Sequence, residues 1–138
     1  MSASIPAALV DTDILSAVMR QHPTALVRAR AYLALHHRLA FSIITRYEIL
    51  RGLHAKGATR QLAAVEQLCG MSTIVPLTEG IVVRAAIIYA DLSRRGVLIG
   101  DADILIAATG LEHARTIVTN NEDHFRRITG LQIQNWLI

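Results

Sequence analysis

Apolar residues follow two patterns along this chain: short continuous runs, and longer stretches in which they recur at helical spacing. Short apolar runs bounded by polar or turn-forming residues are typical of buried strands, and apolar residues at every third or fourth position are typical of helices that bury one face. The runs predict strands at residues 7–10, 39–43, 73–75, 115–119 and 131–136. The helical spacing predicts helices at residues 26–35, 45–52, 61–69, 81–93 and 102–111.

Local signals refine the ends of these elements. Gly70 and Gly96 follow apolar-periodic stretches and are predicted to close two of the helices. Thr45, with Glu48 three residues later, has the pattern of a capping box, which predicts that the second helix begins near Thr45. The polar residues 120–124 predict a loop.

Strands that alternate with helices predict an α/β fold, here a three-layer α/β/α domain with a central, mainly parallel sheet. In such sheets, ligands bind beyond the carboxyl ends of the strands. Asp11 follows the first predicted strand, and residues 119–123 follow the fourth. Glu48 lies about one turn into the helix after the second strand, and Asp103 lies at the start of the last helix. We therefore expect these four segments to meet at one edge of the sheet.

The composition fits one folded domain, predicted to span residues 1–138. Of the 138 residues, 52% are apolar and 18% are charged, which is enough to bury a core and argues against disorder. The apolar runs are too short to cross a bilayer, and no basic N-terminal region of a signal peptide is present, so we expect a cytoplasmic protein. The single cysteine, Cys69, excludes an internal disulfide framework and a thiolate zinc cluster.

The charge of the chain favours a polyanionic partner, although only modestly. The formal net charge is +3, and Lys56 is the one lysine among the 14 basic residues. Arginine binds phosphate through two parallel hydrogen bonds and stacks on bases, so nucleic acid is a reasonable partner. A charge excess of this size is common in proteins that do not bind nucleic acid.

Four of the 11 acidic residues form two Asp-x-Asp pairs beside apolar runs, Asp11 with Asp13 and Asp101 with Asp103. Acids at the rim of a core normally need a metal ion or a proton. Together with Glu48, Asp11 and Asp103 offer the hard oxygen ligands that Mg²⁺ and Mn²⁺ prefer. A bound ion of this kind polarises a phosphodiester and lowers the pKa of an attacking water. The pattern predicts metal-assisted hydrolysis of phosphodiester bonds.

Each of these acids also has a purely structural interpretation. Asp11 could be the N-cap of a helix that starts at Thr12, and Glu48 could complete the capping box. Asp101 and Asp103 both suit the positive end of a helix dipole. These alternatives remain open from the sequence.

Several segments resemble the PIN-domain nucleases, and especially their VapC-type toxins, in order, spacing and predicted context. The resemblance covers nearly the whole chain, and its segments are Val10–Leu15, Ser42–Gly52, Ile99–Ala108, Val118–Asn121 and Ile128–Trp136. It implies a magnesium-dependent endoribonuclease, with Mn²⁺ as a substitute, that cuts tRNA or other structured RNA. It also implies a cognate, VapB-like antitoxin of a type II toxin-antitoxin system. We further expect a homodimer, because the short chain is rich in apolar helices.

The resemblance also assigns residues. Asp11, Glu48 and Asp103 match the three core acids as catalytic residues and metal ligands, and Asp103 is preferred over Asp101 because Ile106-Ala107-Ala108 follows it at the expected spacing. The fourth acidic position of the family is occupied by Asn121, so Glu122 or Asp123 is needed if a charge is to be supplied there. The supporting residues implied are Asp101, Thr12, Thr119, Asn121 and Glu122.

Two other functions are compatible with parts of the sequence. Asp11-Thr12-Asp13 after a strand is similar to the nucleophile and acid of haloacid-dehalogenase phosphatases, but Lys56, before Gly57, is poorly placed for the lysine that this chemistry needs. The other is a non-catalytic RNA-binding or partner-binding PIN module, in which the acids cap helices and Asn121 marks a lapsed site.

Overall fold

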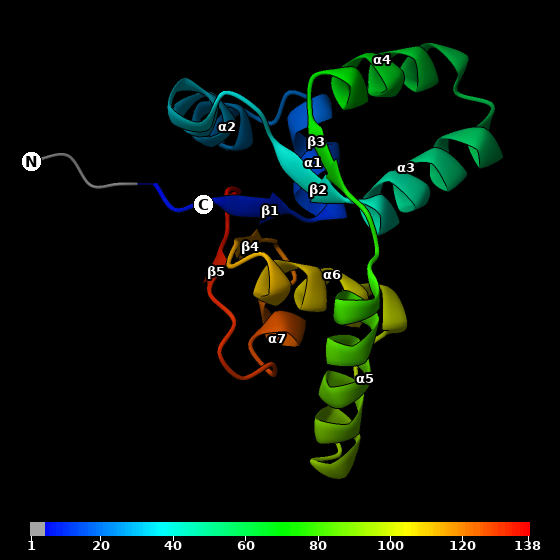
Figure 1. Ribbon diagram of the computed structural model, residues 1–138. Helices are drawn as coiled ribbons and strands as arrows, with labels where there is room; N and C mark the ends of the chain where they lie inside the picture. Colours follow the sequence, from blue (N-terminus) through cyan, green and yellow to red (C-terminus); the bar gives the residue numbers. More distant parts are fainter. Residues whose placement is uncertain (1–4) are drawn as a thin grey trace, which may run out of the picture.

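The computed structural model describes residues 5–138 as short strands joined by helices (Figure 1). The strands are β1 (Ala8–Val10), β2 (Ala40–Ser42), β3 (Thr73–Val75), β4 (Thr116–Val118) and β5 (Ile133–Gln134). The helices are α1 (Thr12–Met19), α2 (Pro23–His36), α3 (Ile43–Lys56), α4 (Thr59–Gly70), α5 (Glu79–Arg94), α6 (Asp101–Glu112) and α7 (Glu122–Phe125). The predicted domain also includes residues 1–4, which lie outside the described residues.

All strand pairs of the sheet are parallel. β4 pairs with β1 on one side and with β5 on the other, and β2 pairs with β3. β1 also lies beside β2, so the two hydrogen-bonded ladders form one central layer (Figure 1). The predicted α/β class and the mainly parallel sheet are therefore confirmed.

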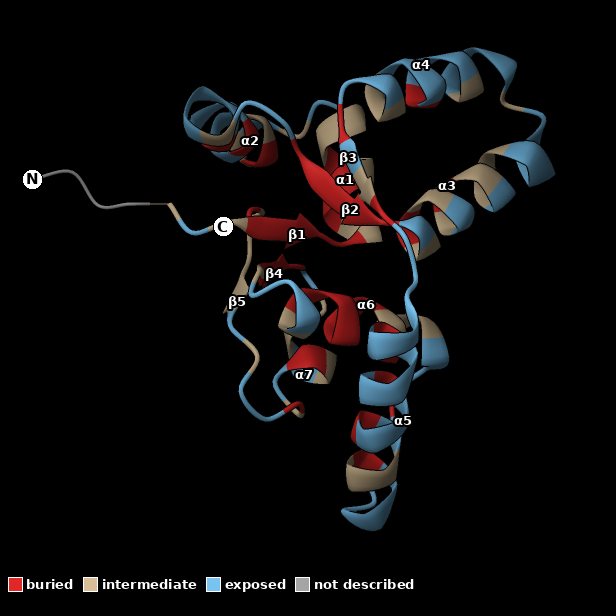
Figure 2. Ribbon diagram, in the orientation of Figure 1, coloured by how far each residue is buried: buried red, intermediate tan, exposed pale blue. Residues whose placement is uncertain are grey.

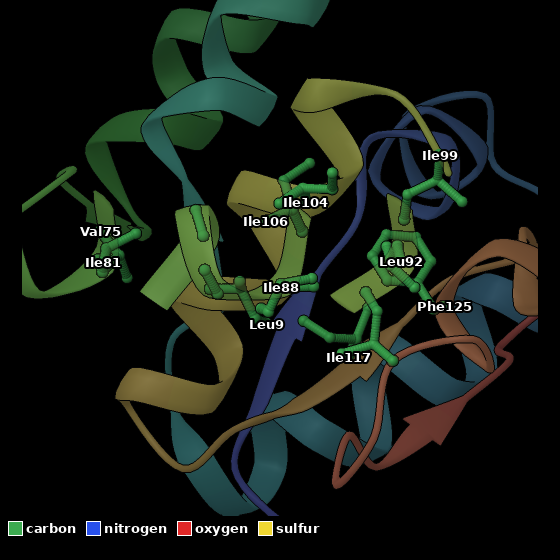
Figure 3. Close-up of a cluster of buried hydrophobic side chains, with 14 of the residues drawn as sticks. Leu9, Val75, Ile81, Ile88, Leu92, Ile99, Ile104, Ile106, Ile117 and Phe125 are labelled. Carbon is green, nitrogen blue, oxygen red and sulfur yellow. The ribbon is translucent and has the colours of Figure 1, made fainter. Parts of the chain in front are cut away.

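Helices cover both faces of this layer because successive strand residues point to opposite sides. Leu9 and Ile117 lie in one core cluster with apolar residues of α5, α6 and α7 (Figure 3). Ala8, Val10 and Val118 lie in a second cluster with residues of α1, α2 and α4. Figure 2 shows β1, β2 and β4 buried between the helical layers. Continuous apolar runs such as residues 8–10 are required for burial on both faces.

The helix after β2 begins near Thr45 as predicted, but the predicted capping box is wrong. α3 begins at Ile43, and Ser42 caps it by accepting a hydrogen bond from the Ile44 backbone N–H at 3.0 Å. Thr45 is instead buried inside the first turn, where its Oγ1 lies 3.2 Å from that of Thr12. Glu48 therefore takes no part in a capping box, and its carboxylate is free for other contacts.

The predicted loop at residues 120–124 was also wrong in part, because α7 forms there. This single turn is too short to show a repeating apolar pattern, and Phe125 is its one buried residue. The predicted last strand is shorter than expected: β5 spans two residues, Ile133–Gln134. Within residues 5–138, no helix combines the length and apolar character needed to cross a membrane.

Gly110 permits the close approach of α6 to β4. A Cβ atom at this position would lie 2.6 Å from Cδ1 of Ile117 and 3.2 Å from the carbonyl oxygen of Arg115. We expect Gly110→Ala to lower the free energy of unfolding by about 1–3 kcal/mol through overpacking, as measured by urea denaturation. Gly52→Ala in α3, where a Cβ would meet nothing within 4 Å, should raise it by about 0.5–1 kcal/mol. Equal effects of the two substitutions would contradict this packing.

Candidate active site

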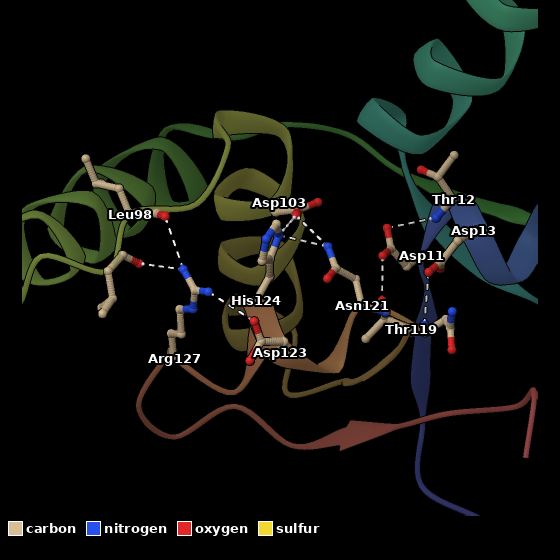
Figure 4. A network of polar contacts seen from close by, with 12 residues as sticks. Asp11, Thr12, Asp13, Leu98, Asp103, Thr119, Asn121, Asp123, His124 and Arg127 are labelled. Atoms are coloured by element: carbon tan, nitrogen blue, oxygen red, sulfur yellow. Dashed lines mark hydrogen bonds and ion pairs between the residues drawn. The ribbon is translucent and has the colours of Figure 1, made fainter.

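Asp11 lies at the carboxyl end of β1 and is the N-cap of α1. It is buried, with 5% of its surface exposed. Its Oδ1 accepts a hydrogen bond from the Thr12 N–H at 2.8 Å, and its Oδ2 accepts one from the Thr119 hydroxyl at 2.7 Å (Figure 4). The capping role considered from the sequence is therefore real, but it occupies one oxygen only. The other oxygen connects Asp11 to the segment after β4.

Glu48 reaches the same end of the sheet from α3. The Thr12 hydroxyl donates to Oε1 of Glu48 at 2.6 Å, so Thr12 contacts Asp11 through its backbone and Glu48 through its side chain. Arg51 lies one turn further along α3, with Nη2 3.7 Å from Oε2 of Glu48. Thr12 thus couples two of the predicted metal ligands, and its bond to Glu48 joins positions 36 residues apart.

Asp103 lies in the first turn of α6, and two side chains from the segment after β4 contact it. His124 Nδ1 lies 3.0 Å from Oδ2 of Asp103, and Asn121 Nδ2 donates to the same oxygen at 3.3 Å. The Asn121 backbone N–H in turn donates to the Thr119 hydroxyl at 2.9 Å. A continuous chain of hydrogen bonds therefore runs from Asp11 through Thr119 and Asn121 to Asp103 (Figure 4).

Asp13 adds a further carboxylate to this group. Its Oδ2 accepts a hydrogen bond from the Asn120 N–H at 3.0 Å, and its Oδ1 accepts one from the Ile14 N–H at 2.8 Å. The Asp-x-Asp pattern pointed to Asp13, but it was not among the predicted site residues. Its contact with Asn120 places it at the junction of the β1 and β4 ends.

The surroundings of Asp11 and Asp13 disfavour the ionised form of both carboxyl groups. The pKa of Asp11 is raised from 3.8 to about 7, first by burial and then by the charge of Asp13, with a smaller contribution from Asp103. Hydrogen bonds from Thr119 and Thr12 oppose this rise in the pKa. The pKa of Asp13 is also raised, mainly by burial. Carboxylates in this state are stabilised by a proton or by a cation.

A groove of about 570 Å³ opens beside this cluster, between α1, α3 and α4. Thr12 and Glu48 form part of its wall, so these side chains can be reached from outside. Other residues that line the groove include the basic Arg20 and Lys56 and the larger apolar residues Val18, Met19, Ile49, Leu53 and Leu68.

The donor set fits a hard divalent cation. Among residues 5–138, no three histidine, cysteine, aspartate or glutamate side chains are gathered closely enough to hold a metal ion by themselves. Mg²⁺ needs no such cluster, because it usually keeps several waters and binds one or two carboxylates together with substrate phosphates. Asp11 with its raised pKa, and Asp103 close enough to contribute to that rise, are the ligands that such an ion would use.

Only some of the predicted supporting residues contact the acids of the site. Thr12, Thr119 and Asn121 contact the acids directly, as described above. Asp101 is exposed at the first position of α6. Glu122 pairs with Arg126 at 3.0 Å and accepts a hydrogen bond from Asn135. Asn121, and not Glu122, is therefore the residue that reaches Asp103.

His124, like Asp13, belongs to the site but is absent from the predicted site residues. Its ring contacts Asp103. Asp123, which was considered as a source of charge, is exposed and pairs with Arg127 at 3.1 Å (Figure 4). The signal for His124 was its spacing of three residues from Asn121, which places both on one face only if a helical turn forms.

The raised pKa of Asp11 predicts a pH dependence of stability in chelator. Between pH 4 and 7 the folded state holds a proton that the unfolded chain releases, so the free energy of unfolding falls as the pH rises through this window. Asp11→Asn removes this contribution. The variant should therefore gain about 1–3 kcal/mol relative to the parent between pH 4 and pH 8, measured by urea denaturation. A difference between the two proteins that does not change with pH would contradict the raised pKa.

Comparison with known proteins identifies the family. The family model of the PIN domain matches residues 8–131. The tRNA(fMet)-specific endonuclease VapC of Salmonella typhimurium is 31% identical over 100 residues, covering 72% of this chain and 76% of that protein. Ribonuclease VapC1 of Haemophilus influenzae strain R2866 is 28% identical over 129 residues, covering 93% of this chain and 96% of that protein.

Solved structures agree with this family. The crystal structure of DNA-bound VapBC from Salmonella typhimurium matches with a TM-score of 0.84 at 26% identity, over 96% of this chain and 99% of that chain. VapBC-1 from nontypeable Haemophilus influenzae matches with a TM-score of 0.82 at 29% identity, with the same coverage. The PIN-domain match at residues 8–131 includes Asp11, Glu48 and Asp103. The chain belongs to the PIN domain family and, within it, to the VapC proteins.

Proposed function

We propose that this protein is a metal-dependent endoribonuclease, the toxin of a toxin-antitoxin pair, which hydrolyses phosphodiester bonds in tRNA or other structured RNA. The observation that carries the proposal is the buried carboxylate of Asp11, whose pKa is raised to about 7 by burial and by neighbouring acids. Perturbed acids gathered at strand ends mark functional sites in α/β proteins. Support also comes from the relatives, which are named as ribonucleases and as a tRNA-specific endonuclease.

Asp11 and Asp103 would hold the cofactor, Mg²⁺ or, as a substitute, Mn²⁺, and Glu48, the third predicted ligand, would bind it through one of the waters that the ion keeps. Their oxygens are the hard ligands that these ions prefer. When bound, such an ion polarises the phosphodiester and lowers the pKa of a water molecule.

The chain itself supplies fixed positions for these oxygens. Thr119 holds one oxygen of Asp11, Thr12 holds one oxygen of Glu48, and Asn121 holds one oxygen of Asp103. Each carboxylate is thus oriented by a hydrogen bond before substrate arrives, which reduces the reorganisation needed in the transition state. The groove along α1, α3 and α4 leaves Glu48 accessible.

A cognate antitoxin of the VapB type is the proposed partner protein. The two solved structures compared above are VapBC complexes, and one of them is bound to DNA. An antitoxin would silence the nuclease in the cell, so the toxin has to be separated from it before any assay.

The direct test is incubation of the antitoxin-free protein with total tRNA in Mg²⁺, in Mn²⁺ and in chelator. The parent should give discrete fragments, and chelator should abolish them. Asp11→Asn and Asp103→Asn should each reduce cleavage at least about 100-fold, because each removes a proposed metal ligand. Asp101→Asn is the matched control, and it should cleave like the parent because Asp101 is exposed and two residues from the site carboxylate.

Two results would contradict the proposal. Intact RNA in every lane, from protein shown to be folded, would favour the non-catalytic binding module. Cleavage that survives both chelator and Asp11→Asn would place the activity elsewhere.

The homodimer expected from the sequence remains a prediction. α5 exposes Val82, Val83 and Ile87, each at 52% or more of its surface, and apolar side chains of this kind are typical of subunit contacts. Light scattering coupled to size exclusion should give twice the 15.1 kDa chain mass in the absence of antitoxin. Ile87→Glu should shift the mass toward that of the monomer. A parent protein that already elutes as a monomer at micromolar concentration would rule the dimer out.

A further inference from the structure

Asp103 is held by two side chains that follow β4, and they contact the same oxygen atom. His124 Nδ1 lies 3.0 Å from Oδ2 of Asp103, and Asn121 Nδ2 lies 3.3 Å from it. Figure 4 shows the imidazole and the amide side by side against the carboxylate. The side chain of Asp103 is 22% exposed and that of His124 is 38% exposed, so water competes only in part with these contacts.

The backbone around His124 is anchored on both sides. Phe125, the next residue, has no exposed surface and lies in the core cluster with Leu9 and Ile117. Asn121, three residues earlier, is fixed by its N–H bond to the Thr119 hydroxyl at 2.9 Å. The one-turn helix α7 therefore presents the imidazole to Asp103 from a fixed position.

Hydrogen-bond chemistry selects one arrangement of the imidazole. Nδ1 lies 2.8 Å from Asn121 Nδ2 as well as 3.0 Å from Asp103, and it cannot accept from the amide and donate to the carboxylate at once. An ionised carboxylate only accepts, and hydrogen bonds to it are stronger than neutral ones. The favoured tautomer therefore carries its hydrogen on Nδ1 and donates it to Asp103, while Asn121 donates to the same oxygen. The cost of this arrangement is that two donor nitrogens, Nδ1 of His124 and Nδ2 of Asn121, approach to 2.8 Å.

We propose that His124 is a positioning residue of the metal site, whose Nδ1–H holds Oδ2 of Asp103 and leaves Oδ1 for the ion. This proposal depends on the function proposed above. Groups that orient a metal ligand typically change metal affinity or activity 10–100-fold when removed. Asn121 and His124 together thus put two hydrogen-bond donors where the family resemblance predicts a further acid.

Two other histidines, His22 and His36, contact backbone or aromatic groups and not a predicted metal ligand. His22 Nδ1 accepts the Ala25 N–H at the start of α2. His36 stacks on Tyr32, with ring centroids 4.3 Å apart, and contacts the Ile5 carbonyl. Both of these contacts stabilise local structure, whereas the partner of His124 is a predicted metal ligand.

The test uses three substitutions of His124 that distinguish the contribution of Nδ1 from that of Nε2. Asparagine places an amide nitrogen near the position of Nδ1, glutamine places one near that of Nε2, and alanine provides neither. The matched control is His54→Ala, an exposed residue in the last turn of α3. Mn²⁺ binding to the RNA-free protein is measured by isothermal titration calorimetry, and RNA cleavage is measured as a function of Mn²⁺ concentration. Urea denaturation in chelator establishes that every variant is folded.

His124→Ala and His124→Gln should raise the dissociation constant for Mn²⁺ about 10–100-fold. His124→Asn should restore most of the affinity, and His54→Ala should bind like the parent. In the cleavage assay the loss in the alanine variant should be recovered in part at high Mn²⁺ concentration, because the defect lies in binding the ion.

The failure of this proposal differs from the failure of the proposed function. A parent that binds Mn²⁺ and cleaves RNA, with His124→Ala equal to it in affinity, would overturn the positioning role alone. Equal rescue by glutamine and asparagine would overturn the assignment to Nδ1. A parent that binds Mn²⁺ but cleaves no RNA would overturn the proposed function, while the order of affinities among the variants would still decide the role of His124. A parent that binds no Mn²⁺ would overturn the positioning role, and it would overturn the proposed function as well if it also cleaves no RNA.

Discussion

The buried carboxylate of Asp11, held between the ends of two parallel strands, is the constraint on which the rest of the site depends. The pairing of Val10 with Val118 brings the ends of β1 and β4 together, and the Asp11 N–H donates to the Val118 carbonyl at 2.8 Å. The Asp11 side chain then bonds Thr12 at the start of α1 and Thr119 after β4. From these two threonines the hydrogen bonds extend to Glu48 and to Asn121.

The unpaired carboxylates of the site lower the stability of the metal-free protein. Elsewhere, acids are paired: Asp91 bonds Arg95 and Glu66 bonds Arg46, and the pKa of each of these carboxyls is lowered. Within residues 5–138, neither Asp11 nor Asp13 has a basic side chain within 4.0 Å, and the pKa of each is raised by burial. Such unpaired buried acids are retained for function more often than for stability, because a cation supplied from solution can compensate them.

The sequence predicted a structural feature correctly where residue type and adjacent residues alone determine that feature. Apolar runs located the strands, so the sequence indicated that Asp11 follows β1 and that Asp103 lies in the first turn of α6. Ser42 and Thr45 were both suitable caps by residue type, and the choice depended on where the β2 ladder ends, which is a tertiary property. His124 was missed because α7 is a single turn held by Phe125 in the core, and no periodic pattern exists over four residues.

Proton release on metal binding tests the central claim most directly. If the buried Asp11 has a pKa of about 7 in the metal-free protein and becomes a metal ligand, Mn²⁺ must displace its proton at pH 6. Calorimetric titrations in buffers of different ionisation enthalpy should then show a release of up to about one proton at pH 6, falling toward zero above pH 8, and no such release from Asp11→Asn. Mn²⁺ binding that is independent of pH, or equally tight in Asp11→Asn, would contradict the account.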